Sequence, residues 1–96
     1  MRMMLKIQMP VEAGNEGIQT GSLPKTIKSL MEDLKPECAY FYPEGGKRAA
    51  MMVFDMADPS NIPLAVEPLL MNLNADVWLT PVMDAADLEK GLQALR

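Results

Sequence analysis

The chain contains no histidine and only one cysteine, Cys38. Without histidine it lacks the commonest metal ligand in proteins and the commonest general base near neutral pH. A single cysteine excludes an internal disulfide and leaves too few ligands for a structural zinc site. We therefore expect no metal and no cofactor, and the sequence contains no catalytic motif.

Long apolar runs and an excess of positive charge are also missing. The apolar runs are far shorter than the roughly 20 residues that a membrane-spanning helix needs. The net charge is −4, which is the wrong sign for binding nucleic acid or an anionic membrane surface. Lys6 and Gln8 interrupt the apolar start of the chain and no small-residue cleavage site follows, so we expect no signal peptide. These features predict a cytoplasmic protein that binds neither nucleic acid nor membrane.

The composition is that of a folded globular protein. Hydrophobic residues make up 49% of the 96 residues and charged residues 23%, which is ordinary for one small domain. We therefore predict a single domain over residues 1–96. The ten methionines are interpreted as core residues that replace Leu and Ile, rather than as an adaptable binding surface.

Alternating apolar residues predict four strands, over residues 3–9, 38–42, 49–57 and 76–83. The third has apolar residues on both faces, which is typical of a central strand. Pro81 lacks a backbone donor and places the fourth strand at an edge. Residues 43–46 read Pro-Glu-Gly-Gly and predict the turn of a hairpin between the second and third strands.

Apolar residues at three- and four-residue spacing predict helices over residues 22–35, 62–73 and 85–95. A short or bent helix is expected over residues 11–20, because Gly14 and Gly17 weaken it. Pro68 should kink or split the helix over residues 62–73. Asp84 is the expected N-cap of the last helix, whose inner side is predicted to carry Leu88, Leu92 and Leu95.

This order of elements predicts an α+β fold of the ferredoxin-like βαββαβ type, with an extra C-terminal helix. Right-handed crossovers put the helices on one face of a four-stranded antiparallel sheet. The other face then stays uncovered, although it is too apolar to face water. By alternation its members are Met4, Lys6, Gln8, Tyr40, Tyr42, Met51, Val53, Asp55, Trp78, Thr80 and Val82. For residues 38–42 the two faces look alike, so alternation leaves open which of them turns toward the helices.

The sequence contains the stretches KPECAYF (residues 35–41), DMADPS (residues 55–60), Ile62-Pro63, Glu67-Pro68, PVM (residues 81–83) and Asp87-Leu88. Together these stretches resemble a small family of uncharacterised bacterial proteins. The resemblance implies a ferredoxin-like domain of the dimeric α+β-barrel type and transfers no catalytic residue. The wider dimeric α+β-barrel group, which includes cofactor-independent monooxygenases and heme-processing proteins, is similar only in the order of elements.

Two functional hypotheses follow for the uncovered face. The first is a homodimeric domain that binds a small ligand or a partner, with the aromatic residues as anchors of the dimer or of a pocket. The alternative is a small cofactor-independent enzyme, oxygenase- or isomerase-like, that uses a Tyr, Asp or Lys of the same face. Lys6 and Asp55 are expected to form a cross-strand ion pair. The candidate site residues are Lys6, Gln8, Tyr40, Tyr42, Val53, Asp55, Trp78 and Thr80.

Overall fold

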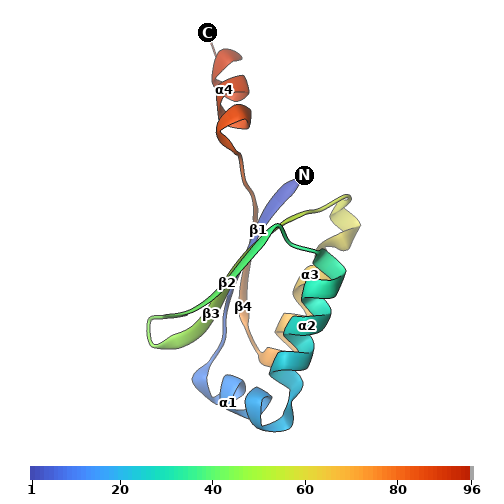
Figure 1. The fold of residues 1–96 in the computed structure, drawn as a ribbon, viewed down its shortest axis with the longest axis vertical. Helices are drawn as coiled ribbons and strands as arrows, with labels where there is room; N and C mark the ends of the chain where they lie inside the picture. Colours follow the sequence, from blue (N-terminus) through green and yellow to red (C-terminus); the bar gives the residue numbers. More distant parts are fainter. Residues whose placement is uncertain (96) are drawn as a thin grey trace.

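The structure is a computed structural model, and it describes residues 1–95. The strands and helices follow one another in the order β-α-α-β-β-α-β-α (Figure 1). The predicted element types are all present, and most boundaries move by two residues or fewer. The elements are β1 (Arg2–Gln8), α1 (Val11–Thr20), α2 (Ser22–Leu34), β2 (Cys38–Glu44), β3 (Lys47–Asp55), a 3-10 turn (Pro59–Asn61), α3 (Ile62–Leu73), β4 (Asp76–Pro81) and α4 (Ala85–Gln93).

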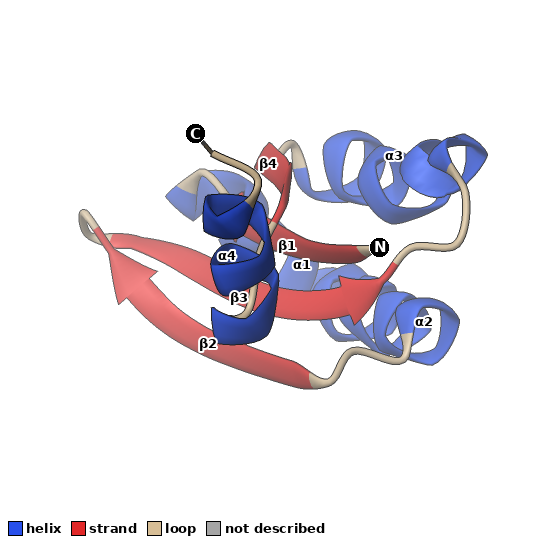
Figure 2. Cartoon of the chain, turned by 90° about the horizontal axis from the view of Figure 1, so that it is seen from above, coloured by secondary structure: helices blue, strands red, loops and turns tan. Residues whose placement is uncertain are grey.

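The four strands form one antiparallel sheet in the order β2-β3-β1-β4. This order confirms that β1 and β3 are central and that β4 lies at the edge beside β1. Helices α1, α2 and α3 lie on one side of the sheet (Figures 1 and 2). The ferredoxin-like prediction is therefore confirmed, with the first crossover divided into two helices. Within residues 1–95, no helix combines the length and apolar character needed to cross a membrane.

The core lies between the central strands and the helices. Leu5 and Ile7 of β1, Met52 of β3, and Leu69 and Leu73 of α3 are fully buried. Each such side chain stabilises the fold by about 1.5–3 kcal/mol relative to an exposed one. Every second residue of β1 from Met3 onward belongs to this core, as the alternation predicts. One sheet face is therefore sealed by helices, and the other remains open.

Glycines allow α1 to pack closely against its neighbours. A Cβ atom at Gly17 would lie 2.9 Å from Cβ of Leu23 in α2, and one at Gly14 would lie 2.5 Å from Nη1 of Arg48 in β3. The Arg48 guanidinium donates hydrogen bonds to the carbonyl of Val11 (3.3 Å) and to Oδ1 of Asn15 (3.0 Å). These glycines weaken the helix intrinsically, but they permit contacts that hold α1 in place.

Helix α3 runs without a break from Ile62 to Leu73 although it contains Pro68. The expected split at this proline is therefore wrong, whereas the expected kink stays a prediction. Pro68 removes one donor to the carbonyl of Leu64, four residues earlier. Burial of Ala65, Leu69 and Leu73 against the sheet keeps the helix in one piece.

The C-terminal helix projects beyond the end of the sheet, on the side away from α1 (Figure 1). The prediction that Leu88, Leu92 and Leu95 face the core of the same domain is therefore wrong: they are 46%, 55% and 71% exposed. The start of α4 is well defined, because Asp84 and Asp87 form a capping box. The backbone N–H of Val82 donates to the carbonyl of Arg2 at 3.1 Å, and the Arg2 guanidinium binds Asp84 at 3.1 Å.

We expect Gly17→Ala to destabilise the domain. Alanine favours the helix by about 1 kcal/mol, but forcing a methyl group against Leu23 costs about 1–3 kcal/mol. The net loss should be about 1 kcal/mol in urea-induced unfolding. The matched control is Gly91→Ala in α4, where an added Cβ meets no atom within 4 Å. A Gly17→Ala chain as stable as the Gly91→Ala chain would contradict the close approach of α1 and α2.

Acid should weaken the start of α4. The backbone N–H of Asp87 and then the Arg2 guanidinium lower the pKa of Asp84. Because its pKa is lowered in the folded chain, ionised Asp84 stabilises the cap at pH values above the ordinary pKa of about 4. This contribution is lost as the pH falls through the lowered pKa. The Cα chemical shift of Leu88 should therefore move toward its random-coil value below about pH 4. Asp84→Asn, which keeps a neutral N-cap, should reduce this pH dependence. A Leu88 shift that stays constant into strong acid would contradict the expectation.

Candidate functional site

The candidate site is the sheet face that α1, α2 and α3 leave uncovered, called the open face from here on. Directly opposed residues in antiparallel strands point to the same side of a sheet. The strand register therefore assigns all eight predicted site residues to this one face. Across the sheet from β2 to β4, its rows are Tyr42–Ala49–Gln8–Asp76, Tyr40–Met51–Lys6–Trp78 and Cys38–Val53–Met4–Thr80, followed by Asp55–Arg2; Val82 lies just beyond the end of β4.

The central row combines a fixed cation with exposed aromatic rings. The Lys6 ammonium lies 5.5 Å from the ring centroid of Trp78 and 3.0 Å from Oε2 of Glu44. Trp78 is 48% exposed, and Tyr40 at the opposite edge of the row is 64% exposed. A cation near the face of an indole ring is attracted by the negative potential of the ring. The row therefore offers two aromatic surfaces on either side of a positive charge.

Glu44 holds the polar side chains of this face in position. Its carboxylate binds Lys6, and its backbone carbonyl accepts a hydrogen bond from Nε2 of Gln8 at 2.8 Å. The hydrogen bond to Glu44 is the main reason that the pKa of Lys6 is raised. A raised pKa keeps the ammonium protonated through the neutral range. Lys6 is therefore suited to bind an anion or a π surface, and poorly suited to act as a general base.

Glu44 was missed in the sequence because it was interpreted as part of the turn. Strand β2 continues through Glu44, and only Gly45 and Gly46 form the turn, both with positive φ. The signal was present in the alternation: Cys38, Tyr40, Tyr42 and Glu44 fall on one face. Because the strand continues to Glu44, its carboxylate reaches the same face as Lys6.

The expected ion pair between Lys6 and Asp55 is not formed. Lys6 lies opposite Met51, whereas Asp55 lies opposite Arg2 at the other end of β1. The two side chains are thus separated by about 13 Å along the strand direction. Oδ1 of Asp55 instead accepts a hydrogen bond from the Met1 ammonium at 2.8 Å. Asp55 is therefore on the open face but apart from the polar cluster around Lys6.

A second charged cluster lies at the Arg2 end of the open face. The guanidinium of Arg2 binds Glu37 at 2.6 Å and Asp84 at 3.1 Å. All three side chains are exposed, so the two ion pairs add little stability. They connect the loop before β2 to the start of α4 through Arg2. Within the described residues, no three His, Cys, Asp or Glu side chains are arranged to hold a metal ion.

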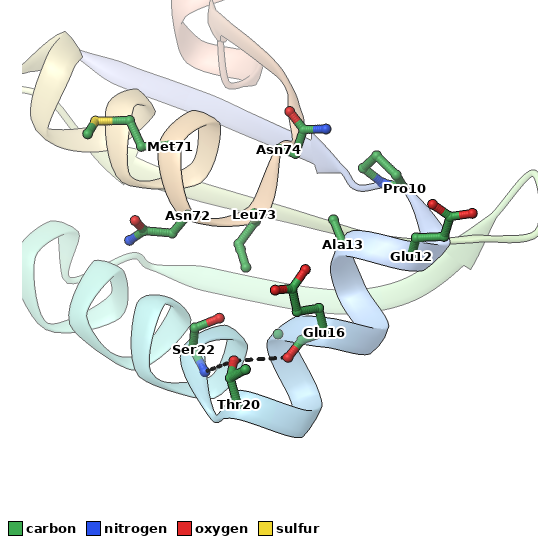
Figure 3. A pocket seen from close by; sticks show the side chains of 11 residues that line it. Pro10, Glu12, Ala13, Glu16, Thr20, Ser22, Met71, Asn72, Leu73 and Asn74 are labelled. Carbon is green, nitrogen blue, oxygen red and sulfur yellow. Dashed lines mark hydrogen bonds between the residues drawn. The ribbon is translucent and has the colours of Figure 1, made fainter.

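A polar hollow of about 360 Å³ lies among α1, the start of α2 and the end of α3 (Figure 3). Glu16, Thr20, Asn72 and Asn74 are among its lining residues. The Thr20 hydroxyl donates to the carbonyl of Glu16 at 2.9 Å and accepts from the backbone N–H of Ser22 at 3.3 Å. This hydroxyl is thus engaged in closing the α1–α2 turn, which explains its position without a ligand.

An apolar groove of about 570 Å³ lies on the helix side, between the β2–β3 hairpin and helices α1 and α2. It is called the hairpin groove from here on. Ile18 and Phe41 line it and are each more than half exposed. The sequence analysis did not identify this groove, because alternation shows that Phe41 lies opposite Tyr40 and Tyr42 but not that its side chain stays exposed. Its lining residues are Met9, Ile18, Leu23, Pro24, Ile27, Phe41, Tyr42, Pro43, Arg48, Ala49 and Ala50.

The titration of Lys6 tests the polar cluster. Because the pKa of Lys6 is raised, the Lys6–Glu44 pair stabilises the fold at pH values below the ordinary lysine pKa of about 10.4. This contribution is lost as the pH rises through the raised pKa. Glu44→Gln should lower the Lys6 midpoint in an NMR titration of its side chain. Glu37→Gln, which removes a carboxylate that binds Arg2 and not Lys6, should leave that midpoint unchanged. Equal midpoints in the parent and Glu44→Gln chains would exclude the pair.

Comparison with known proteins supports the fold alone. No family model and no curated protein matches the chain, so the resemblance to a bacterial family gains no support from them. Among solved structures, the chain is similar to a de novo designed protein, Ferredog-Diesel. The TM-score is 0.52 at 7% sequence identity, over 84% of this chain and 85% of the designed one. This is a likeness of small α+β architecture, and fold does not imply function.

Proposed function

We propose that the protein is a homodimeric binding domain whose open face receives a small ligand or a second copy. The observation that carries the proposal is the central row of that face, where the Lys6 ammonium lies 5.5 Å from the Trp78 ring and Tyr40 and Trp78 are exposed to solvent. Large aromatic side chains gathered on an uncovered sheet are characteristic of interaction surfaces.

The chemistry of the row favours a flat apolar compound that carries a carboxylate. Lys6 has three N–H donors and uses one of them on Glu44. The remaining donors suit an anionic oxygen, and the neighbouring rings suit an aromatic body. Met4, Met51 and Val53, which are half-buried on the same face, add an adaptable apolar floor. An aromatic acid is the ligand class that meets all of these groups together.

A second copy would enclose such a ligand. One sheet face by itself is a platform, whereas ligand sites are usually concave and bury most of the ligand surface. Two open faces related by a twofold axis would bury the apolar side chains of both copies and leave a space beside the Lys6–Trp78 pairs. Closed twofold dimers are also the commonest arrangement among soluble oligomers.

The alternative of an enzyme requires a general base on the same face. Lys6 is the titratable group at its centre, and its pKa is raised by Glu44, which keeps it protonated. Asp55 is bound to the chain terminus at one end of the face. The arrangement therefore supports binding better than proton abstraction.

We expect the purified protein to be a dimer, and to show increased thermal stability in the presence of aromatic carboxylic acids. Trp78→Ala should weaken ligand binding roughly 30-fold, because a buried aromatic anchor contributes about 2 kcal/mol. Met71→Ala is the matched control, since Met71 is an exposed apolar residue on α3. Light scattering that gives a monomer near 10.6 kDa would exclude the dimer. Thermal shifts that are identical in the parent and Trp78→Ala chains would exclude the ligand site.

A further inference from the structure

We propose that α4 is exchanged between two copies of the chain, and that its leucine stripe occupies the hairpin groove of the second copy. The stripe consists of Ala85, Leu88 and Leu92, which recur at three- and four-residue spacing along one side of the helix. The inference extends the proposed homodimer by assigning its second contact. It does not depend on which ligand the open face binds.

The first argument is that α4 requires a partner surface. It has 9 residues, and none of them is buried. A helix shorter than about 12–15 residues is only marginally stable in water by itself. A well-formed capping box fixes its start, and Leu88 and Leu92 are exposed along one side. A capped amphipathic helix of this kind is stabilised when its apolar side is covered.

The second argument is that α4 cannot reach the hairpin groove of its own chain. Asp84 is held at the Arg2 end of β1, whereas the groove residues Ala49 and Ala50 pair with the Gln8 end of that strand. The two ends are separated by about 20 Å along the strand. Leu92 lies only about 12 Å beyond Asp84 along the helix. The groove is also at the β2 edge, three strand positions away from β4.

The third argument is the fit between the two surfaces. The hairpin groove is lined almost entirely by apolar side chains, and Arg48 is the one charged residue among them. Within residues 1–95, no carboxylate lies in ion-pair distance of Arg48. On α4, Glu89 borders the leucine stripe. In the proposed contact, the apolar side of α4 with Glu89 next to it packs into an apolar groove that contains Arg48, so the two charges are complementary.

The fourth argument is the area that a stable dimer needs. A four-stranded sheet of this length has a face of about 19 by 23 Å, or roughly 440 Å² in projection. A standard interface buries about 800 Å² on each partner. Burial of α4 in addition to the open face would bring the interface closer to that size. A twofold axis across the strands would set the Arg2 end of one sheet beside the Gln8 end of the other, and the exchanged helices would add buried area there.

Crosslinking between two different variants tests the exchange directly. Both chains carry Cys38→Ser; one also carries Gln93→Cys, beside the stripe, and the other Ile18→Cys, in the groove. A short bismaleimide should join them into a species of twice 10.6 kDa. The control replaces Ile18→Cys with Met71→Cys, an exposed position on α3 outside the groove. At least a tenfold higher yield for the Ile18 pair is expected; equal yields, or no product from the Ile18 pair, would overturn the exchange.

Light scattering separates this proposal from the proposed function. The Leu88→Ser/Leu92→Ser chain should dissociate at a concentration at least tenfold higher than the parent, with the near-ultraviolet spectrum of Trp78 in its monomer matching the parent monomer. A dimer that is unaffected by these substitutions would overturn the exchange while leaving the open-face dimer intact. A parent chain that is monomeric at every concentration would overturn both.

Discussion

The rest of the structure depends on the pairing of β1 with two neighbours at once. This strand lies between β3 and β4, and each of its residues from Met3 to Gln8 has a partner on both sides. Leu5 and Ile7 are completely buried against the helices, while Lys6 and Gln8 point to the open face. Because side chains alternate along a strand, one segment builds the hydrophobic core and the centre of the candidate site together. A shift by one residue in this strand would exchange the two faces.

The fold was predictable because its determinants are local. The alternation of Met3, Leu5, Ile7 and Met9, the glycine pair at the hairpin and the apolar spacing of α3 each select one type of element. Their order then leaves few topologies. The exceptions have tertiary causes. Pro68 does not divide α3, because burial of one side of the helix outweighs one lost hydrogen bond.

The composition of the open face was predictable, but the contacts across it were not. Alternation defines which face a residue lies on, and it is unchanged when two strands slide by two or four residues. Lys6 and Asp55 were therefore assigned correctly to one face, yet the register sets Lys6 opposite Met51. The partner that Lys6 does have, Glu44, depends on β2 continuing to the edge of the turn. Strand ends and register are set by turn geometry, which the pattern of apolar residues does not encode.

Helix α4 shows what an amphipathic pattern specifies. Leu88 and Leu92 indicate that one side of the helix is to be covered. The pattern is the same whether the covering surface belongs to the same chain or to another. The position of the helix decides between these two cases. Arg2 holds Asp84 at the end of the sheet that is farther from the hairpin groove, so the helix and the groove of one chain stay apart. In the exchange proposed above, the apolar groove and the apolar helix of one chain, each out of reach of the other, would both be covered when two copies associate.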